Sequence, residues 1–127
     1  MIQIQKIDVK DTYDLRHKLL RPHQSIDLCQ YPGDLDSHTA HYGAYRSGEI
    51  VGILSIYKVQ NKAIDIAESW QLRAMATTID IRGKGYGSKL IYEAEQYASH
   101  QGARCIWANS RLNAVGFYEN HGYSSVG

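Results

Sequence analysis

A glycine-rich turn in the second half of the chain constrains the fold more than any other segment. The letters RGKGYGS run from Arg82 to Ser88, between a strand-like stretch, Leu72–Ile79, and an amphipathic helical pattern, Ser88–His100. Glycines adopt the left-handed backbone conformation and let a ligand approach the backbone closely. The first N–H groups of the following helix and its dipole would complete an anion site. This order of strand, turn and helix predicts an α/β fold that binds a diphosphate at the turn.

Positive charge surrounds the turn. Arg82, Lys84 and Lys89 lie in or beside it, and no acidic residue lies between Asp80 and Glu93. The glycine spacing is G-x-G-x-G, late in the chain, whereas a dinucleotide-binding turn has G-x-G-x-x-G after an early strand. A Walker motif is also absent from the sequence. A nucleotide-binding protein remains an alternative hypothesis, and a plain turn before a solvated basic helix is the simplest alternative.

The rest of the chain alternates between strand and helix patterns. The predicted elements are a strand at Ile2–Lys6, a helix at Thr12–Leu20 capped by Asp11, hairpin strands at His41–Tyr45 and Ile50–Tyr57, a strand at Arg104–Ala108 and a helix at Leu112–Asn120. Residues 21–39 are polar and predict a loop with room for one short helix. This order predicts one mixed α/β domain over residues 1–127, with strand–helix–strand crossovers in its second half.

Composition excludes several classes of protein. Lys and Arg number 14 and Asp and Glu number 13, so no charge excess indicates binding to nucleic acid or an anionic membrane. The longest apolar run, Ile50–Tyr57, is far shorter than the ~20 residues that span a bilayer, and the N-terminus lacks the apolar core of a secretory signal. Cys29 and Cys105 have no metal-ligand spacing and form no disulfide framework. We therefore expect reduced thiols, no bound metal and a cytoplasmic location.

A second motif follows the glycine turn: Ala114, Phe117, Tyr118, Gly122 and Tyr123 are spaced as A-x-x-F-Y-x-x-x-G-[FY]. The two motifs, in this order, resemble the GCN5-related N-acetyltransferase (GNAT) family. Arg82–Ser88 resembles that family's [QR]-x-x-G-x-[GA] pyrophosphate turn, and the preceding LRAMATTIDI looks like its fourth strand. The stretch WANSRLNAVGFYENHGY resembles its fifth strand and the helix that follows. The spacing of the second motif is that family's signature. The resemblance implies a mixed, centrally splayed sheet flanked by helices.

The sequence departs from the family pattern in two places. The family continues past the Gly-[FY] strand with another strand, whereas this sequence stops at Gly127. We expect the final strand to be missing from this chain, or supplied by a second copy, which predicts a homodimer. Many relatives place Asn seven residues before the Tyr of the F-Y pair, a position that Arg111 holds here. Asn109, Arg111 and Asn113 therefore remain alternatives for a contact with the cofactor.

The resemblance implies acetyl-coenzyme A (acetyl-CoA) as acetyl donor and a primary amine, on a small molecule or a peptide, as acceptor. Backbone groups of Met75 and Thr77 would pair with the pantetheine arm as an extra half-strand. The turn would bind the pyrophosphate through its backbone amides, the Arg82 charge and the Ser88 hydroxyl. The residues assigned to this contact are Arg82, Gly83, Lys84, Gly85, Tyr86, Gly87 and Ser88.

Direct transfer to an amine needs a base and a group that stabilises the leaving thiolate. A lysine-like amine has a pKa of about 10.4, so its neutral form costs roughly 4–5 kcal/mol to reach at pH 7. The candidate bases are Glu68 and His41, although a solvated acid and a surface or capping histidine are the simpler interpretations. Tyr118 occupies the family's general-acid position and would stabilise the thiolate as a hydrogen-bond donor. Helix packing is the alternative role for Tyr118.

Two further alternatives concern the acceptor and the activity itself. Asp34, Asp36 and His38 form a charged loop that could attract a cationic substrate, or could be a solvated surface. The absence of a final strand from the sequence favours a second function, a catalytically silent acyl-CoA-binding or regulatory module. Retention of Tyr118 argues against that alternative.

Overall fold

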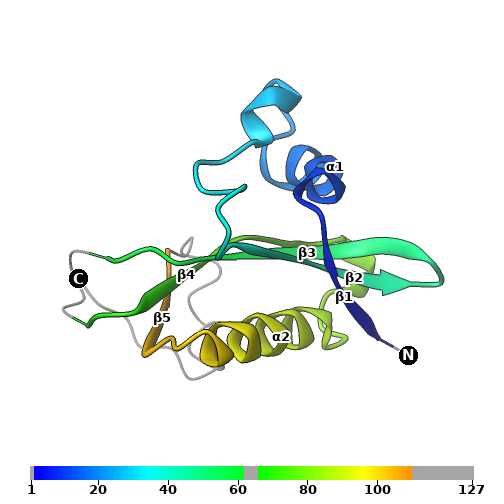
Figure 1. Cartoon of the computed structure of the whole chain (residues 1–127). Helices are drawn as coiled ribbons and strands as arrows, with labels where there is room; N and C mark the ends of the chain where they lie inside the picture. Colours follow the sequence, from blue (N-terminus) through cyan, green and yellow to red (C-terminus); the bar gives the residue numbers. More distant parts are fainter. Residues whose placement is uncertain (1, 62–65, 110–127) are drawn as a thin grey trace.

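A single sheet separates two helical layers in the part of the chain that the structure describes (Figure 1). The computed structural model describes residues 2–61 and 66–109. Its strands, which neighbour one another in chain order, are β1 (Gln3–Ile7), β2 (Ala40–Arg46), β3 (Glu49–Tyr57), β4 (Ser69–Thr77) and β5 (Cys105–Ala108). The β1–β2, β2–β3 and β3–β4 pairs are antiparallel, and β4 pairs with β5 in parallel. The predicted mixed α/β class is confirmed.

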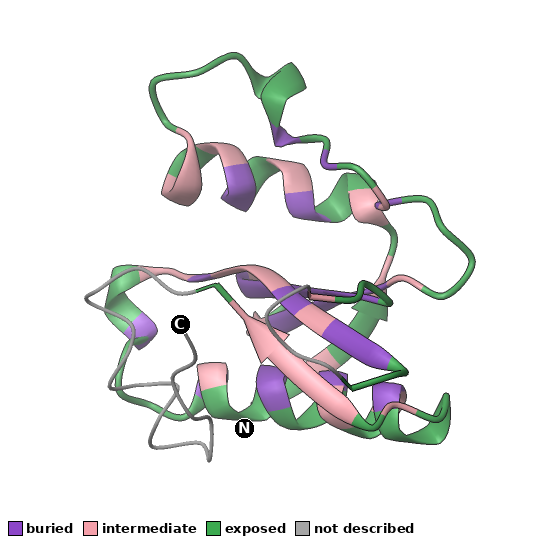
Figure 2. Ribbon diagram, turned by 90° about the vertical axis from the view of Figure 1, so that its left-hand side faces the viewer, coloured by how far each residue is buried: buried purple, intermediate pink, exposed green. Residues whose placement is uncertain are grey.

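One face of the sheet is apolar and is covered by helix α2 (Tyr86–His100). Side chains alternate between the two faces along each strand, so every second strand residue points toward α2. The sheet contributes Tyr42, Leu54, Ile56, Trp70 and Leu72, and α2 contributes Leu90, Ile91, Ala94 and Ala98. The outer side of α2 is exposed (Figure 2). The burial of each large apolar side chain contributes about 1.5–3 kcal/mol, so this layer is the main core.

The opposite face of the sheet carries a helical segment, Val9–Leu20, and is only partly apolar. Leu15 packs there against Ile53 and Ala76 in a second, smaller cluster. Beyond that cluster, the polar side chains of Ser55 and Tyr57 in β3 replace apolar ones and bond to Arg16 of the same helical segment. One end of this face is therefore apolar, and the other end is lined by hydrogen-bonding side chains.

This helical segment departs from its prediction. It consists of a 3-10 turn η1 (Val9–Thr12), an α-helical turn α1 (Tyr13–Leu15) and a π turn η2 (Arg16–Leu20). Asp11 is not the cap: the extended residue before the helix is Asp8, and Asp11 lies in the first turn. There its charge faces the positive end of the helix, which stabilises it as a cap would.

Other boundaries shift by a few residues. Strand β4 ends at Thr77 rather than Ile79, because a 3-10 turn, η4 (Ile79–Ile81), follows it. The expected short helix in the loop is η3 (Ile26–Cys29), which Ser25 caps through its side chain. Cys29 is buried, whereas Cys105, for which a strand interior predicts a core position, is partly exposed. The predicted helix at residues 112–120 and the question of a final strand lie outside the described residues.

Candidate active site

The C-terminal half of β4 has one unpaired edge among the described residues. β5 pairs with β4 only over Ser69–Leu72, and the strands do not pair beyond that point. From Arg73 to Thr77, β3 is the one strand of the described residues that pairs with β4. Such an edge presents backbone N–H and C=O groups that can hydrogen-bond to an extended ligand as a further strand would.

A bulge interrupts β4 next to the point where β5 ends. Ser55 of β3 lies opposite Arg73, and Ile53 lies opposite Ala76. Two residues of β4, Ala74 and Met75, therefore lie opposite the one β3 residue between Ile53 and Ser55. Ala74 has φ of 60°, an unusual value for a residue with a side chain. A bulge leaves an extra residue unpaired and re-aims the backbone, so its polar groups become available beside the open edge.

The hydrogen-bond pattern shows which groups point to that edge. The Thr78 N–H donates to the Val51 carbonyl at 2.9 Å, which marks this position as one bonded to β3. Bonded and non-bonded positions alternate in an antiparallel pair, so the N–H and C=O of Thr77 point away from β3. The Arg82 guanidinium accordingly reaches the Thr77 carbonyl, at 3.4 Å from Nη2. Met75, two residues before Thr77, lies at the bulge, and the same alternation directs its N–H and C=O away from β3.

The glycine turn lies between β4 and α2. Gly83 and Gly85 have φ of 79° and 89°, in the left-handed region that favours glycine, and Gly85 is the residue that precedes α2. Gly87 lies within α2 and has no positive φ, so what glycine contributes at this position is the absence of a side chain. The N–H groups of Tyr86 and Gly87 have no acceptor inside the helix. They lie at the positive end of a 15-residue helix whose first turn holds no acid.

Three cations flank this helix start. The side chains of Arg82, Lys84 and Lys89 are all exposed. Asp80, the nearest acid, is held by Arg46 and by the Thr78 hydroxyl. The hydrogen bonds from Thr78 and Arg46 lower the pKa of Asp80, so its carboxylate stays charged and paired. The turn therefore keeps a positive surface that suits a diphosphate.

The candidate bases lie in different environments. Glu68, which precedes β4, is exposed and forms an ion pair with Lys58 at 3.2 Å. It lies at the end of β4 remote from the glycine turn. Roughly 16 Å of strand separates its backbone from that of Arg73, at about 3.3 Å per residue. Asn109 is exposed just after β5, whereas Asn113 and Tyr118 lie outside the described residues.

His41 is buried, and both of its ring nitrogens are hydrogen-bonded within the protein. Nε2 lies 3.0 Å from the Asp34 carbonyl, which can only accept, so this nitrogen carries the proton. Nδ1 then accepts from the Ser55 hydroxyl at 2.6 Å. Burial lowers the pKa of His41, which favours this neutral form. In this arrangement His41 orients Ser55 and has no nitrogen directed at a ligand.

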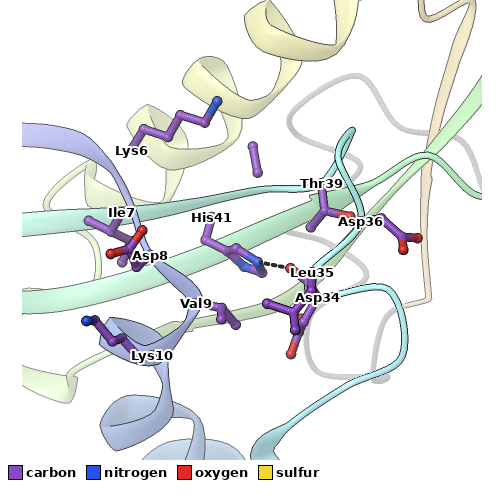
Figure 3. A pocket seen from close by; sticks show the side chains of 11 residues that line it. Lys6, Ile7, Asp8, Val9, Lys10, Asp34, Leu35, Asp36, Thr39 and His41 are labelled. Atoms are coloured by element: carbon purple, nitrogen blue, oxygen red, sulfur yellow. Dashed lines mark hydrogen bonds between the residues drawn. The ribbon is translucent and has the colours of Figure 1, made fainter.

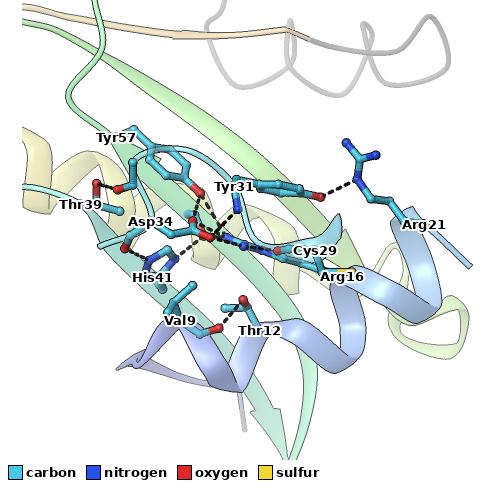
Figure 4. A network of polar contacts seen from close by, with 12 residues as sticks. Val9, Thr12, Arg16, Arg21, Cys29, Tyr31, Asp34, Thr39, His41 and Tyr57 are labelled. Atoms are coloured by element: carbon cyan, nitrogen blue, oxygen red, sulfur yellow. Dashed lines mark hydrogen bonds and ion pairs between the residues drawn. The ribbon is translucent and has the colours of Figure 1, made fainter. Parts of the chain in front are cut away.

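Arg16 is the centre of a buried polar network that the sequence analysis did not identify (Figure 4). Its guanidinium donates to both carboxylate oxygens of Asp34 at 2.8 and 3.1 Å, and to the Cys29 carbonyl at 2.8 Å. It also donates to Ser55 and Tyr57 of β3. One available signal was that Arg16 lies between Leu15 and Leu19, on the side of the helical segment that faces the sheet.

Asp34 therefore has a different role from the one expected. Its carboxylate also accepts from the Tyr57 hydroxyl at 2.6 Å and from the Tyr31 N–H at 2.8 Å. Burial alone would raise the pKa of Asp34, but the hydrogen bonds from Arg16 and Tyr57 hold it below its usual value. Because this charge is turned inward and paired, Asp34 does not attract a cationic substrate. Asp36 is exposed beside it.

A pocket of about 450 Å³ opens near strands β1 and β2, between the end of β1 and the loop over residues 34–39 (Figure 3). Its charged walls include Lys6, Asp8, Lys10 and Asp36, so both signs are present. Strands β2 and β4 are two strand spacings apart, roughly 10 Å. None of the residues that line this pocket belongs to β4 or to the glycine turn. No group of three or more metal-binding side chains occurs in residues 2–61 and 66–109. In the same residues no helix is long and apolar enough to cross a bilayer.

Comparisons with known proteins agree with this architecture. A profile of the acetyltransferase (GNAT) family matches residues 3–123. The chain is 35% identical over its full length to YitI of Bacillus subtilis strain 168, described as an uncharacterized N-acetyltransferase, and covers 85% of that protein.

Solved structures are similar at lower identity. The aminoglycoside acetyltransferase AAC(6')-Iy, in complex with a bisubstrate analogue of CoA and acetylneamine, has a TM-score of 0.82 at 14% identity, covering 100% of this chain and 93% of that one. An acetyltransferase from Clostridium acetobutylicum solved with acetyl-CoA has a TM-score of 0.81 at 16% identity, covering 98% and 91%. These two similarities show a shared fold.

Proposed function

The chain belongs to the acetyltransferase (GNAT) family and is an N-acetyltransferase, and we propose that it moves the acetyl group of acetyl-CoA directly to a primary amine. One observation carries this proposal. The open edge of β4 leads, without interruption by another described strand, into a cationic glycine turn at a helix N-terminus. An extended chain ending in a diphosphate matches both parts of this surface at once.

The diphosphate of CoA would bind at the start of α2. Backbone N–H groups of the turn, from Gly83 to Ser88, would donate to its oxygens, while Arg82 and Lys84 add charge. The pantetheine arm would then run back along β4. Its amides would pair with the outward-facing backbone of Thr77 and Met75, as in strand addition. Asn109 and Asn113 remain the proposed side-chain contacts after β5.

The thioester would lie at the bulge, where β4 and β5 separate. The backbone that the bulge frees at Ala74 and Met75 could donate to the thioester carbonyl and stabilise the oxyanion as the amine attacks. Tyr118 would donate to the departing thiolate. The C–N bond forms first and gives the tetrahedral oxyanion, while the amine loses its proton to a base; the C–S bond then breaks as the carbonyl re-forms, and the thiolate leaves.

The nature of that base follows from the two environments. His41 uses both nitrogens inside the protein, whereas the Glu68 carboxylate is exposed and, among the described residues, forms its ion pair with Lys58. We therefore favour Glu68 as the base. The length of strand between it and the bulge requires that the proton reach it through a chain of several water molecules.

An acetyl-transfer assay tests the proposal against its alternatives. The protein is mixed with acetyl-CoA and a panel of primary amines, and the release of free CoA thiol is recorded. Release that depends on protein and amine supports an enzyme. CoA binding without release for any amine would favour a silent acyl-CoA-binding module. Stabilisation by ATP but not by CoA in a thermal-shift measurement would favour a nucleotide-binding protein.

A further inference from the structure

Three arginines surround one buried tyrosine ring on the sheet face that carries the helical segment Val9–Leu20. The guanidinium carbons of Arg16, Arg73 and Arg21 lie 4.4, 4.5 and 5.3 Å from the centre of the Tyr31 ring. Tyr31 is only 9% exposed, so the ring is a fixed platform. Its hydroxyl accepts from Arg21 Nε at 3.2 Å, as Figure 4 shows. Guanidinium groups stack on aromatic faces in this way while their N–H groups stay available at the edges.

The charges of this cluster do not balance within the described residues. Arg16 is neutralised by Asp34. Within residues 2–61 and 66–109 the side chain of Arg21 bonds to two uncharged partners, the Tyr31 hydroxyl and the Gln24 side chain. No acid of the described residues forms an ion pair with Arg21 or Arg73. Both side chains are partly exposed, so a ligand can reach them. Two like charges held on one ring favour the binding of an anion between them.

The cluster lies beside the reacting atoms of the proposed function. Arg73 is the last residue of β4 before the bulge at Ala74 and Met75. Leu72 packs in the core under α2, so Arg73, its neighbour, projects from the opposite face of the sheet. An amine that approaches the thioester from this face would have Arg73 next to it.

We propose that the amine acceptor carries an anionic group, a carboxylate or a phosphate, which Arg73 and Arg21 bind beside Tyr31. The inference rests on the proposed function, because it places the acceptor where the thioester would lie. A planar guanidinium donates two parallel hydrogen bonds to either anion, so the same pair suits both. Polyamines and other purely cationic acceptors are disfavoured, because they would meet two unneutralised arginines.

Matched pairs of amines test this proposal. One pair is 5-aminovalerate and pentylamine, which differ by a remote carboxylate; the other is glucosamine 6-phosphate and glucosamine. We expect the wild-type protein to prefer the anionic member of at least one pair by roughly tenfold to a hundredfold in kcat/KM, the size of one charge-assisted hydrogen bond. The pair that shows the preference distinguishes a carboxylate from a phosphate. Equal or better use of the members that lack the carboxylate or phosphate, or of spermidine, would overturn the proposal.

Variants separate recognition from structure. In Arg73→Gln the ratio of kcat/KM between the two amines of a pair should fall toward one, because KM for the anionic amine rises. Arg73→Lys should recover part of that ratio. Arg104→Gln, an exposed arginine that precedes β5, serves as the matched control and should keep the preference. A loss of kcat for both members of a pair, with a lower melting temperature, would make Arg73 structural and overturn the proposal.

Anion binding to the CoA-saturated protein gives a readout that does not require turnover. Saturating CoA occupies the glycine turn, so added inorganic phosphate or glutarate reports on other sites. The melting temperature should rise with one of these anions in the wild type and not in Arg73→Gln; no rise in the wild type overturns the proposal. Failure of CoA itself to bind would instead refute the proposed function.

Discussion

Asp34→Asn removes a buried charge while keeping the shape of the side chain. In the native protein the Asp34 carboxylate accepts four hydrogen bonds, two from Arg16 and one each from Tyr57 and the Tyr31 amide. Arg16 is fully buried, so the variant leaves its charge without a counter-ion. The new NH₂ group also faces donors instead of accepting from them. Removal of one partner of a buried ion pair costs about 3–5 kcal/mol, which corresponds to roughly 10–20 °C in melting temperature for a domain of this size.

Urea unfolding followed by circular dichroism measures this cost. Asp36→Asn is the control, because Asp36 is exposed in the same loop and its loss should change stability by no more than about 0.5 kcal/mol. A loss in Asp34→Asn as small as in Asp36→Asn would refute the description of the network.

The cost should depend on pH in a defined direction. The folded pKa of Asp34 is below its ordinary value of 3.8, so the charged form stabilises the folded state. This stability is fully present above the unfolded pKa and is lost as pH falls through the folded pKa. The difference between wild type and Asp34→Asn should therefore be largest near neutral pH and shrink in acid.

Two further predictions concern His41 and Tyr118. The pKa of His41 in the folded protein lies below its usual 6.5, so the unfolded chain takes up a proton first as pH falls, and wild-type stability should drop below pH 6.5. The urea midpoints measured at pH 8 and at pH 5 should therefore differ less in His41→Gln than in the wild type. An equal difference in the two proteins would contradict a buried neutral histidine. Tyr118→Phe should leave the CoA affinity unchanged and lower kcat by about 10²–10³-fold, as expected for the loss of one preorganised donor; wild-type turnover in a folded variant would show that another group stabilises the thiolate.

Local patterns in the sequence predict most of the strands and helices because each reflects short-range physics. The hairpin between β2 and β3 follows from two alternating segments around Ser47 and Gly48, which both take positive φ in the structure. Helix α2 follows from its apolar stripe and the glycines before it. Its start at Tyr86 rather than Ser88 is the kind of end effect that propensity does not resolve.

The buried network could not be predicted in the same way. Arg16, Asp34 and Ser55 are far apart in the sequence and meet only because the helical segment packs on one face of the sheet. Residue type alone places Arg and Asp on the surface, since their burial is favourable only when partners satisfy them. The bulge at Ala74 also depends on the register with β3 and carries no local signal. Both features arise from tertiary contacts.

A calorimetric titration of CoA tests the central claim most directly, namely that the glycine turn at the start of α2 binds its diphosphate. Gly85→Val is compared with Gly48→Val, because both glycines have similar positive φ, 89° and 81°, and similar strain on substitution. Gly48 lies in the turn between β2 and β3 and is not part of the glycine turn that precedes α2. The wild type and Gly48→Val should bind CoA with the same affinity. Gly85→Val should bind it roughly tenfold to a hundredfold more weakly, which is the effect of losing one charge-assisted hydrogen bond. Equal affinity in the two variants, or no binding by the wild type, would contradict it.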